Sequence, residues 1–232
     1  MINAPLSPFE LAQRIDHTLL KPTLTRSDLE NLCREAREYR FKTVCIPPSW
    51  VKESVALLRG ASVGTITVVG FPLGYSTSAS KAIEASEAIE QGACEIDMVL
   101  NVSYLKSGRT ADAQADVAQV VRACGSVPVK VIIETAYLTE DEKKTAALLS
   151  ERAGARFIKT STGFASGVPV TGATLEDIAL LRKILRPSTQ IKASGGIRDL
   201  EGAQALIAAG ADRLGTSSGV TLLSGLQNQG AY

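Results

Sequence analysis

Two lysines occupy matching places in two short segments of the sequence. The segments are FIKTSTG (157–163), which contains Lys159, and QIKASGG (190–196), which contains Lys192. In each segment the lysine lies in an apolar, strand-like stretch that leads into a glycine-containing turn. Burying an ammonium without a partner is costly, because desolvation favours the neutral amine. The pair therefore indicates an amine nucleophile and a second cation that keeps it deprotonated, as in an imine-forming lyase.

A carboxylate and simple electrostatics strengthen this interpretation. We expect the two lysines on neighbouring strands, which lie about 4.8 Å apart in a sheet. At an effective dielectric near 20, two unit charges about 5 Å apart repel by about 3 kcal/mol, which corresponds to roughly two pKa units. One lysine is then largely neutral near pH 7, while Asp97 keeps the other charged. The alternative is that both lysines extend from strand ends with their ammonium groups in water.

Apolar runs that alternate with amphipathic stretches predict the elements that position these residues. The candidate strands recur about every 29 residues, the length of one strand and one crossover helix. They are short and mostly apolar, as expected for a parallel sheet covered on both sides. The eight predicted strands are residues 14–20, 43–46, 65–69, 95–100, 129–134, 156–160, 190–193 and 213–215.

Helix signals lie between the predicted strands. Capping boxes begin at Ser7 and Thr139, and Thr174 resembles a third helix start. Three similar tripeptides, at 91–93, 153–155 and 209–211, place glycine at a helix end just before a strand. With no Pro/Gly/Ser-rich linker, the pattern predicts one α/β domain over residues 1–232. We expect a (β/α)8 barrel with an N-terminal helix in 1–13 and a tail at 226–232. A doubly wound open sheet is the alternative.

The turns after the seventh and eighth predicted strands indicate a phosphate site. Gly195 and Gly196 follow the seventh strand, and the eighth leads into Gly215, Ser217 and Ser218. Barrels often hold phosphate between these loops, with backbone N–H groups and a helix N-terminus as donors. The alternative is that these are ordinary turn glycines and a capping serine. Arg198 is the one cation within the two loops, so mainly neutral donors would hold the phosphate.

Other polar residues are weaker candidates. His17 is out of phase with Asp16, so we expect it to pack against the helices if Asp16 faces the lumen. Cys45 is expected to be a small core residue, and the alternative is that it lines the lumen. Three further charged residues are predicted to line the rim or to pair with other charges, and the sequence does not rank them: Lys21, Lys130 and Glu134.

Composition excludes several classes of protein. The 25 basic and 24 acidic residues give a net charge of +1, so no overall field attracts nucleic acid or an anionic membrane. The four cysteines show no metal-like spacing and indicate reduced thiols. No signal peptide and no apolar run of membrane-spanning length is evident. The single histidine excludes a His-based metal site. We expect a soluble cytoplasmic protein.

The combination of motifs resembles the 2-deoxyribose-5-phosphate aldolase family. The matching segments follow one another in the same order over nearly the whole chain. They are IDHTLLKP (15–22), VCIPP (44–48), GFPLG (70–74), EIDMV (95–99), KVIIE (130–134) and the two lysine segments. The resemblance implies a cofactor-free class I aldolase with a (β/α)8 fold. Such enzymes interconvert 2-deoxy-D-ribose 5-phosphate with acetaldehyde and D-glyceraldehyde 3-phosphate.

The resemblance also implies roles for individual residues. The Schiff base falls on Lys159, the perturbing lysine on Lys192 and the proton-relay carboxylate on Asp97. Tyr232 matches a terminal tyrosine that takes part in proton transfer, and a frayed terminus is the alternative. Phosphate and substrate contacts are expected from eight residues: Asp16, Thr162, Gly163, Gly195, Gly196, Gly215, Ser217 and Ser218.

Three positions depart from common family patterns. Phe164 stands where some members carry a phosphate-binding lysine, which predicts weaker phosphate binding. Tyr75 replaces a smaller residue, and residues 101–105 replace a glycine-containing stretch after the fourth strand.

Two other functions remain open at this stage. A different class I aldolase or a transaldolase would also form the imine, and acetaldehyde as donor would distinguish them. A non-catalytic sugar-phosphate-binding barrel would bind ligand without forming an imine. The expected partner is a small phosphosugar, and relatives suggest a homo-oligomer, either a dimer or a tetramer.

Overall fold

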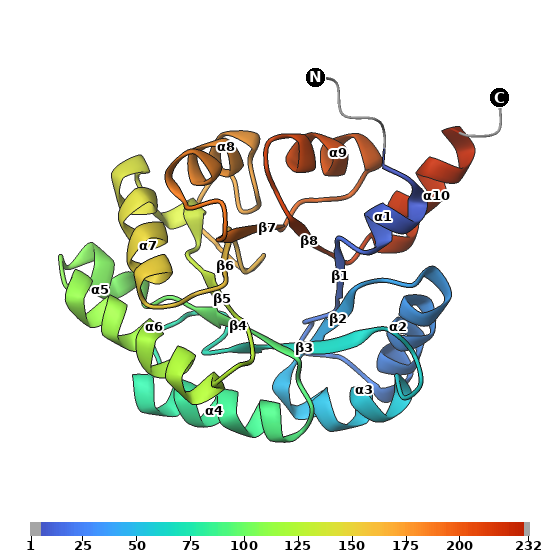
Figure 1. Cartoon of the computed structure of the whole chain (residues 1–232), viewed down its shortest axis with the longest axis horizontal. Coiled ribbons are helices and arrows are strands. Elements are labelled where there is room, and N and C mark those ends of the chain that lie inside the picture. Colours follow the sequence, from blue (N-terminus) through green and yellow to red (C-terminus); the bar gives the residue numbers. More distant parts are fainter. Residues whose placement is uncertain (1–5, 230–232) are drawn as a thin grey trace.

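The eight apolar segments form parallel strands that close into a barrel in the order β1 to β8 (Figure 1). The structure is a computed structural model that describes residues 6–229. β1 pairs with β2 on one side and with β8 on the other, which closes the sheet. The strands are β1 (Ile15–Thr18), β2 (Thr43–Ile46), β3 (Gly64–Val69), β4 (Glu95–Val99), β5 (Val129–Ile132), β6 (Phe157–Lys159), β7 (Gln190–Ser194) and β8 (Arg213–Thr216). The predicted (β/α)8 barrel is confirmed, and the open doubly wound sheet is excluded.

Every predicted strand is present, with bounds that differ by at most two residues at each end. The region predicted as 14–20 is a strand only over Ile15–Thr18, and that predicted as 129–134 only over Val129–Ile132. The apolar character continues past these strand ends because the chain stays buried where it turns away from its neighbours. The apolar pattern therefore predicts where the strands lie, whereas backbone pairing determines where they end.

Helices surround the barrel and connect successive strands (Figure 1). The α-helices are α1 (Pro8–Ala12), α2 (Arg26–Tyr39), α3 (Val51–Leu57), α4 (Ser78–Glu90), α5 (Val102–Lys106), α6 (Thr110–Cys124), α7 (Glu140–Arg152), α8 (Leu175–Ile184), α9 (Leu200–Ala208) and α10 (Gly219–Gln229). Two short 3-10 helices follow β2 and β5, namely η1 (Pro48–Trp50) and η2 (Thr135–Tyr137).

Side-chain caps fix several helix starts at the predicted positions. The side chain of Ser7 caps α1 and that of Thr139 caps α7, each in a full capping box. Thr174 caps α8 by accepting a hydrogen bond from the backbone N–H of Asp177. These side chains satisfy N–H groups that have no partner within the helix. The sequence does not predict α5; it begins at Val102, with Asn101 as its N-cap, in the segment that departs from the family pattern.

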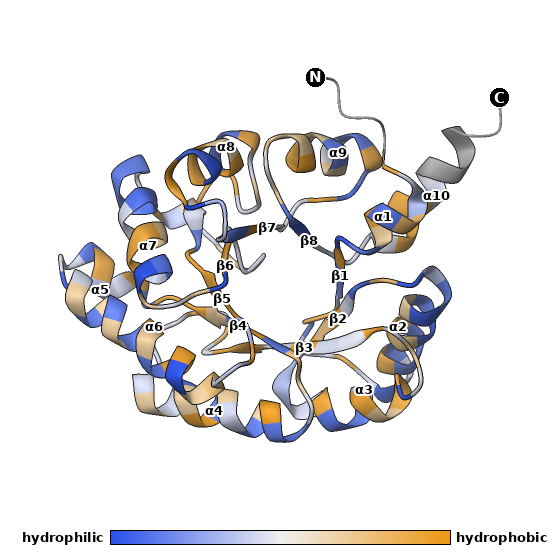
Figure 2. Ribbon diagram, viewed as in Figure 1, coloured by the Kyte–Doolittle hydropathy of each residue, from blue (hydrophilic) through white to orange (hydrophobic). Residues whose placement is uncertain are grey.

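The main core lies between the barrel and its ring of helices. The helices carry hydrophobic stretches beside hydrophilic ones (Figure 2), as expected when only one side of each helix is buried. A smaller apolar cluster of Cys45, Ile66 and Val68 is separate from this core. Its members come from β2 and β3, and charged side chains fill much of the remaining barrel interior.

α10 extends to Gln229, so the first part of the tail predicted at 226–232 is helical. Over residues 6–229, no helix is both long and apolar enough to cross a membrane. All four cysteines are free thiols, as the sequence predicts.

Candidate active site

Strand register places Lys159 and Lys192 at the same level of the barrel. Lys159 on β6 is the direct Cα partner of Lys192 on β7. Asp97 on β4 is the Cα partner of Lys130 on β5. All four side chains are buried, and alternation along the strands directs them to one face of the sheet. The expectation that the two lysines lie on neighbouring strands and share a face is confirmed.

Asp97 lies at the centre of three lysines. Its Oδ2 atom accepts hydrogen bonds from Nζ of Lys159 and Nζ of Lys192, both at 2.8 Å. Its Oδ1 atom accepts from Nζ of Lys130 at 2.7 Å. Since one oxygen binds both Lys159 and Lys192, their nitrogens can lie no further apart than twice that hydrogen-bond length. Two ammonium groups at this separation would repel each other strongly in a buried site.

Further ion pairs extend this cluster. Asp16 on β1 lies 2.5 Å from Nζ of Lys192 and 2.6 Å from the guanidinium of Arg213 on β8. Glu95 on β4 lies 2.5 Å from Nζ of Lys130 and also contacts Arg213 at 3.3 Å. Within the described part of the chain, these ion pairs join four basic side chains to three carboxylates.

This excess of one cation falls on Lys159. Lys192 contacts two carboxylates, Asp16 and Asp97, and Lys130 likewise contacts two. Among the described residues, Lys159 contacts only Asp97, which it shares with both other lysines. Deprotonating Lys159 therefore removes the buried charge that has the weakest compensation.

The pKa shifts agree with this count. Burial lowers the pKa of Lys159, and the charge of Lys192 adds to that effect against the opposing attraction of Asp97. For Lys192, burial acts in the same direction, but Asp16 and Asp97 outweigh it and raise its pKa. Burial by itself would raise the pKa of the Asp97 carboxyl. The three surrounding lysines outweigh this effect and hold that pKa well below its usual value. These directions favour loss of the proton from Lys159 before Lys192, beside a carboxylate on Asp97 that stays ionised.

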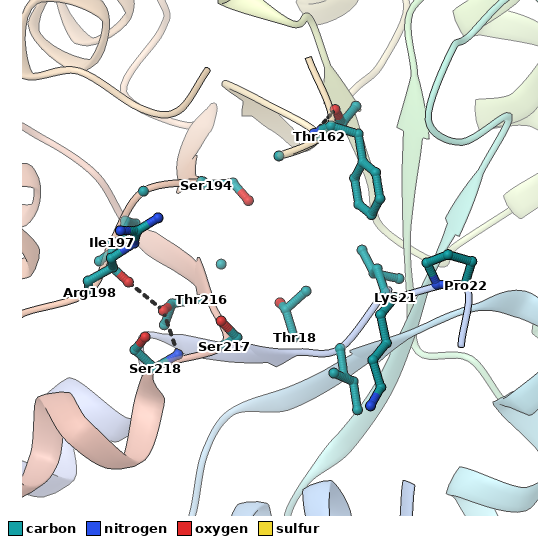
Figure 3. A pocket seen from close by; sticks show the side chains of 17 residues that line it. Thr18, Lys21, Pro22, Thr162, Ser194, Ile197, Arg198, Thr216, Ser217 and Ser218 are labelled. Carbon is teal, nitrogen blue, oxygen red and sulfur yellow. Dashed lines mark hydrogen bonds between the residues drawn. The ribbon is translucent and has the colours of Figure 1, made fainter. Parts of the chain in front are cut away.

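A cavity of about 520 Å³ lies at the carboxyl ends of the strands. Figure 3 shows the side chains that line it. Thr18 and Ser194 line it. Thr18 lies two residues after Asp16, and Ser194 lies two residues after Lys192. Lys159 is 2% exposed and lies beneath this cavity rather than in its wall. The remaining lining residues come from the end of β8 and from the loops after β1, β6, β7 and β8: Leu19, Leu20, Lys21, Pro22, Thr162, Gly163, Phe164, Gly195, Gly196, Ile197, Arg198, Gly215, Thr216, Ser217 and Ser218.

Glycines give this cavity much of its wall. Gly163, Gly195 and Gly196 have positive φ angles of 84°, 83° and 76°, a conformation that residues with side chains rarely adopt. At Gly215 the reason is space, because a Cβ atom there would lie 2.9 Å from Cε of Lys192. Backbone atoms can therefore approach a ligand closely on this side, and Lys192 keeps its position below it.

Polar donors line the same side of the cavity. Ser217 and Ser218 lie across it from Thr162 in Figure 3, and the backbone N–H of Ser218 donates to Oγ1 of Thr216. Two basic residues also line the wall. Lys21 is paired with Asp28 at 2.9 Å, whereas Arg198 makes no ion pair within residues 6–229. A cavity with glycine backbone, hydroxyl groups and one free guanidinium suits a phosphate ester.

Seven of the eight residues expected to bind substrate or phosphate line this cavity. The exception is Asp16, which is fully buried below it and contacts Lys192, Arg213 and Thr43 instead. Tyr232 lies outside the described residues. Phe164 is 46% exposed and packs edge to face on Phe71, with ring centroids 5.3 Å apart.

His17 and Cys45 lie where the sequence predicts. His17 packs on Phe41 outside the lumen, and its Nε2 atom is 2.8 Å from the carboxylate of Glu35. Cys45 is fully buried in the small apolar cluster, and burial raises the pKa of its thiol.

Three charged members of the cluster were missed or left unranked. Lys130 was one of several rim candidates, while Glu95 and Arg213 were not singled out at all. Each lies on a predicted strand and faces the same side of the sheet as a predicted site residue. Glu95 is two residues from Asp97 on β4, and Arg213 is the Cα partner of Lys192. Strand alternation was thus the signal that could have identified them.

The described residues contain no group of three or more His, Cys, Asp or Glu side chains that could hold a metal ion. That the protein works without a metal or cofactor stays a prediction.

Comparisons with known proteins agree with this site. Residues 11–225 match the model of the DeoC/LacD family aldolases. A deoxyribose-phosphate aldolase of Brevibacillus brevis is 54% identical over 217 residues, which are 94% of this chain and 96% of the relative. One of Staphylococcus carnosus is 48% identical over 96% of this chain and its own full length. A tetrameric deoxyribose phosphate aldolase structure from Aeropyrum pernix superposes with a TM-score of 0.88, at 34% identity, over 96% of this chain and 93% of that one.

Proposed function

Because the chain belongs to the DeoC/LacD aldolase family, we propose that it is a class I aldolase acting on 2-deoxy-D-ribose 5-phosphate. The reaction gives acetaldehyde and D-glyceraldehyde 3-phosphate and is reversible. The observation that carries the proposal is the position of Lys159, which shares a single oxygen of Asp97 with the charged Lys192. This arrangement favours a neutral, nucleophilic amine inside the barrel.

In the proposed mechanism, Nζ of Lys159 attacks the aldehyde carbon C1. The carbinolamine loses water and becomes an iminium ion, which can accept an electron pair. Loss of the C3 hydroxyl proton then breaks the C2–C3 bond, and the electron pair moves into an enamine on Lys159. Carbons 3 to 5 leave as glyceraldehyde 3-phosphate. Protonation of the enamine at C2 and hydrolysis of the imine release acetaldehyde and restore the amine.

Asp97 and Lys192 are the proposed proton carriers for these steps. Asp97 is ionised and in contact with the nucleophile, so it can accept a proton directly or through a water molecule. Lys192 stays charged because of Asp16, and it can donate a proton toward the departing hydroxyl of the carbinolamine. Tyr232 is a further candidate for proton transfer at C2, on the resemblance alone.

The phosphate of the substrate is proposed to bind between Gly163, the turn at Gly195 and Gly196, and the serines Ser217 and Ser218. Thr162 and Gly215 complete this wall, and Arg198 supplies charge. Because Phe164 stands where some relatives carry a lysine, Arg198 is the residue proposed to supply positive charge to the phosphate. We therefore expect modest phosphate affinity.

Reduction with borohydride tests the proposal. In the presence of deoxyribose 5-phosphate, borohydride should reduce the imine and add the mass of the bound fragment to a peptide containing Lys159. Lys159→Arg should remove the adduct, and EDTA should leave activity unchanged. Trapping with other sugar phosphates but not with acetaldehyde would point to a different class I aldolase, and binding without trapping to a non-catalytic barrel.

We further propose a homo-oligomer, a dimer or a tetramer, in the cytoplasm. The tetramer named for the Aeropyrum pernix protein supports an oligomer of this chain. Light scattering after size-exclusion chromatography would give two or four times the chain mass, and a monomer across the concentration range would contradict the proposal.

A further inference from the structure

Glu134 is a buried carboxylate in an unusual backbone conformation beside the cavity. It follows β5 directly and is 3% exposed. Its φ and ψ angles are 53° and 68°, in the left-handed region. Arg40 has a similar φ, but there the conformation ends helix α2 in the common way. A non-glycine residue held in this region without such a reason often marks a functional position.

The carboxylate of Glu134 holds the segment that follows Lys159. Its Oε2 atom accepts hydrogen bonds from the backbone N–H of Thr162 at 3.2 Å and from Oγ1 of Thr162 at 2.5 Å. Oγ1 of Thr162 in turn accepts from the backbone N–H of Phe164 at 2.9 Å. One side chain thus fixes both the backbone and the hydroxyl of Thr162 in the cavity wall.

These bonds determine what the Thr162 hydroxyl can offer a ligand. A threonine hydroxyl has one hydrogen and two lone pairs. The hydrogen points to Glu134, and one lone pair is used by Phe164. The remaining lone pair is available to a donor in the cavity. Thr162 is therefore prepared to accept a hydrogen bond, and it cannot donate one while Glu134 is ionised.

The order of groups along the substrate indicates which donor that would be. Lys159 holds C1, and the turn containing Gly163 lies beside the expected phosphate on C5. Thr162 lies between them in the chain and in the wall of the same cavity. The hydroxyl on C4 lies between the reacting carbons and the phosphate, and it takes no part in bond cleavage.

On these grounds we propose that Glu134 is a positioning residue, which orients the Thr162 hydroxyl to accept a hydrogen bond from the C4 hydroxyl of the substrate. The inference rests on the proposed function. It makes Glu134 and Thr162 determinants of specificity for acceptor aldehydes that carry a hydroxyl next to the carbonyl.

The test compares two acceptors in the synthetic direction, with acetaldehyde as the donor. One is D-glyceraldehyde 3-phosphate, and the other is 3-phosphonooxypropanal, which lacks the hydroxyl that becomes the C4 hydroxyl. The quantity measured is the ratio of kcat/KM for the two. A single neutral hydrogen bond predicts a ratio of about ten in the wild-type enzyme. Glu134→Gln and Thr162→Val should each lower it to below about two, and Thr162→Ser should keep it.

A matched control comes from the opposite end of the barrel. Glu151 accepts hydrogen bonds from Oγ1 of Thr189 at 2.6 Å and from the backbone N–H of Arg186 at 3.0 Å, remote from the cavity. Glu151→Gln therefore removes the same kind of contact and should leave the ratio at the wild-type value.

The double variant Glu134→Gln/Thr162→Val should show the same ratio as either single variant, because both changes act through one hydroxyl. If Glu134→Gln lowers both kcat/KM values in proportion, the residue serves only the fold and the inference is wrong. A ratio that stays near ten in Thr162→Val also overturns it. Failure of the proposed function would look different, because no imine would then form on Lys159 with acetaldehyde in the wild-type protein.

Discussion

At the scale of single residues, the site depends on unequal sharing of one carboxylate. Three lysines contact Asp97, and two of them have a second carboxylate. Lys159 has no second carboxylate among residues 6–229, so it is the lysine for which losing the proton costs least. The same residue types with a different distribution of carboxylates would place the neutral amine elsewhere.

Removing Lys192 should therefore change how imine formation depends on pH. Imine formation needs the neutral amine, so its rate rises as pH increases through the pKa of Lys159. Lys192 lowers this pKa by repulsion and competes for Oδ2 of Asp97. In Lys192→Met the pKa of Lys159 rises, and the acidic limb of the rate profile moves to higher pH. At pH 7 we expect a loss of about a hundredfold, partly recovered in alkaline buffer.

To obtain this profile, the protein is incubated with acetaldehyde at each pH, samples are quenched with borohydride at set times, and the rate at which the reduced adduct accumulates is measured. Lys159→Met is the blank, with no adduct at any pH. An acidic limb that stays in place in Lys192→Met would show that Lys192 does not set the protonation of Lys159.

Stability should respond differently to the loss of Lys159 and of Asp97. In Lys159→Met, Asp97 keeps Lys130 and Lys192, so no buried charge loses its last partner. We expect the Tm to stay within about 3 °C of the wild type, or to rise. In Asp97→Asn, three buried lysines lose a shared counter-charge, which costs about 3–5 kcal/mol. For a chain of this size that corresponds to a fall in Tm of about 10 °C.

Thermal unfolding at pH 7, followed by circular dichroism, compares the two variants directly. Equal losses of Tm in Lys159→Met and Asp97→Asn would contradict the charge count on which the site rests.

At the scale of elements, a second buried ion pair anchors the helices that cover β4. Lys81 on α4 lies 2.7 Å from Asp116 on α6, and both side chains are almost completely buried. Nζ of Lys81 also donates to the carbonyl of Val99 at 3.0 Å, at the end of the strand that carries Asp97. Burial lowers the pKa of Lys81, and the contact with Asp116 opposes that effect. The pair thus ties two helices to the strand end.

Breaking only one side of this pair should be costly. Lys81→Met leaves the Asp116 carboxylate buried without a counter-charge. We expect the free energy of unfolding to fall by about 3–5 kcal/mol and the Tm by about 10 °C. The double variant Lys81→Met/Asp116→Leu removes both charges and should recover most of that loss. A double-mutant cycle from urea unfolding measures the coupling. If the double variant is less stable than Lys81→Met, the pair is not a coupled unit.

The sequence predicted these elements well where a local signal exists. Ser7, Thr139 and Thr174 mark helix starts because a capping side chain acts within three residues of itself. Apolar runs mark strands because parallel strands in a barrel are buried on both faces. The contact between Lys81 and Asp116 has no such signal, since it depends on how two helices pack.

At the scale of the whole molecule, closure of the barrel assembles the charged cluster. Asp16 is on the first strand and Lys192 on the seventh, and they meet only because β8 pairs with β1. In an open sheet with the same strand order, six inter-strand spacings of about 4.8 Å would separate β1 from β7. Sequence reasoning found Lys159, Lys192 and Asp97 from local pattern and family motifs. The contacts of Asp16, Glu95 and Arg213 follow from closure and register, which single segments do not encode.

The weak overall charge of the molecule predicts a shallow response to salt. A net charge of +1 provides no long-range field to attract a dianionic substrate. The remaining attraction is local and comes from Arg198, since Lys21 is already paired. Salt screens such exposed charges over a Debye length of about 10 Å at 0.1 M. We therefore expect kcat/KM for deoxyribose 5-phosphate to fall less than about threefold between about 0.02 and about 0.3 M KCl, and to become insensitive to salt in Arg198→Gln. A tenfold fall that persists in Arg198→Gln would mean that charges outside the cavity steer the substrate.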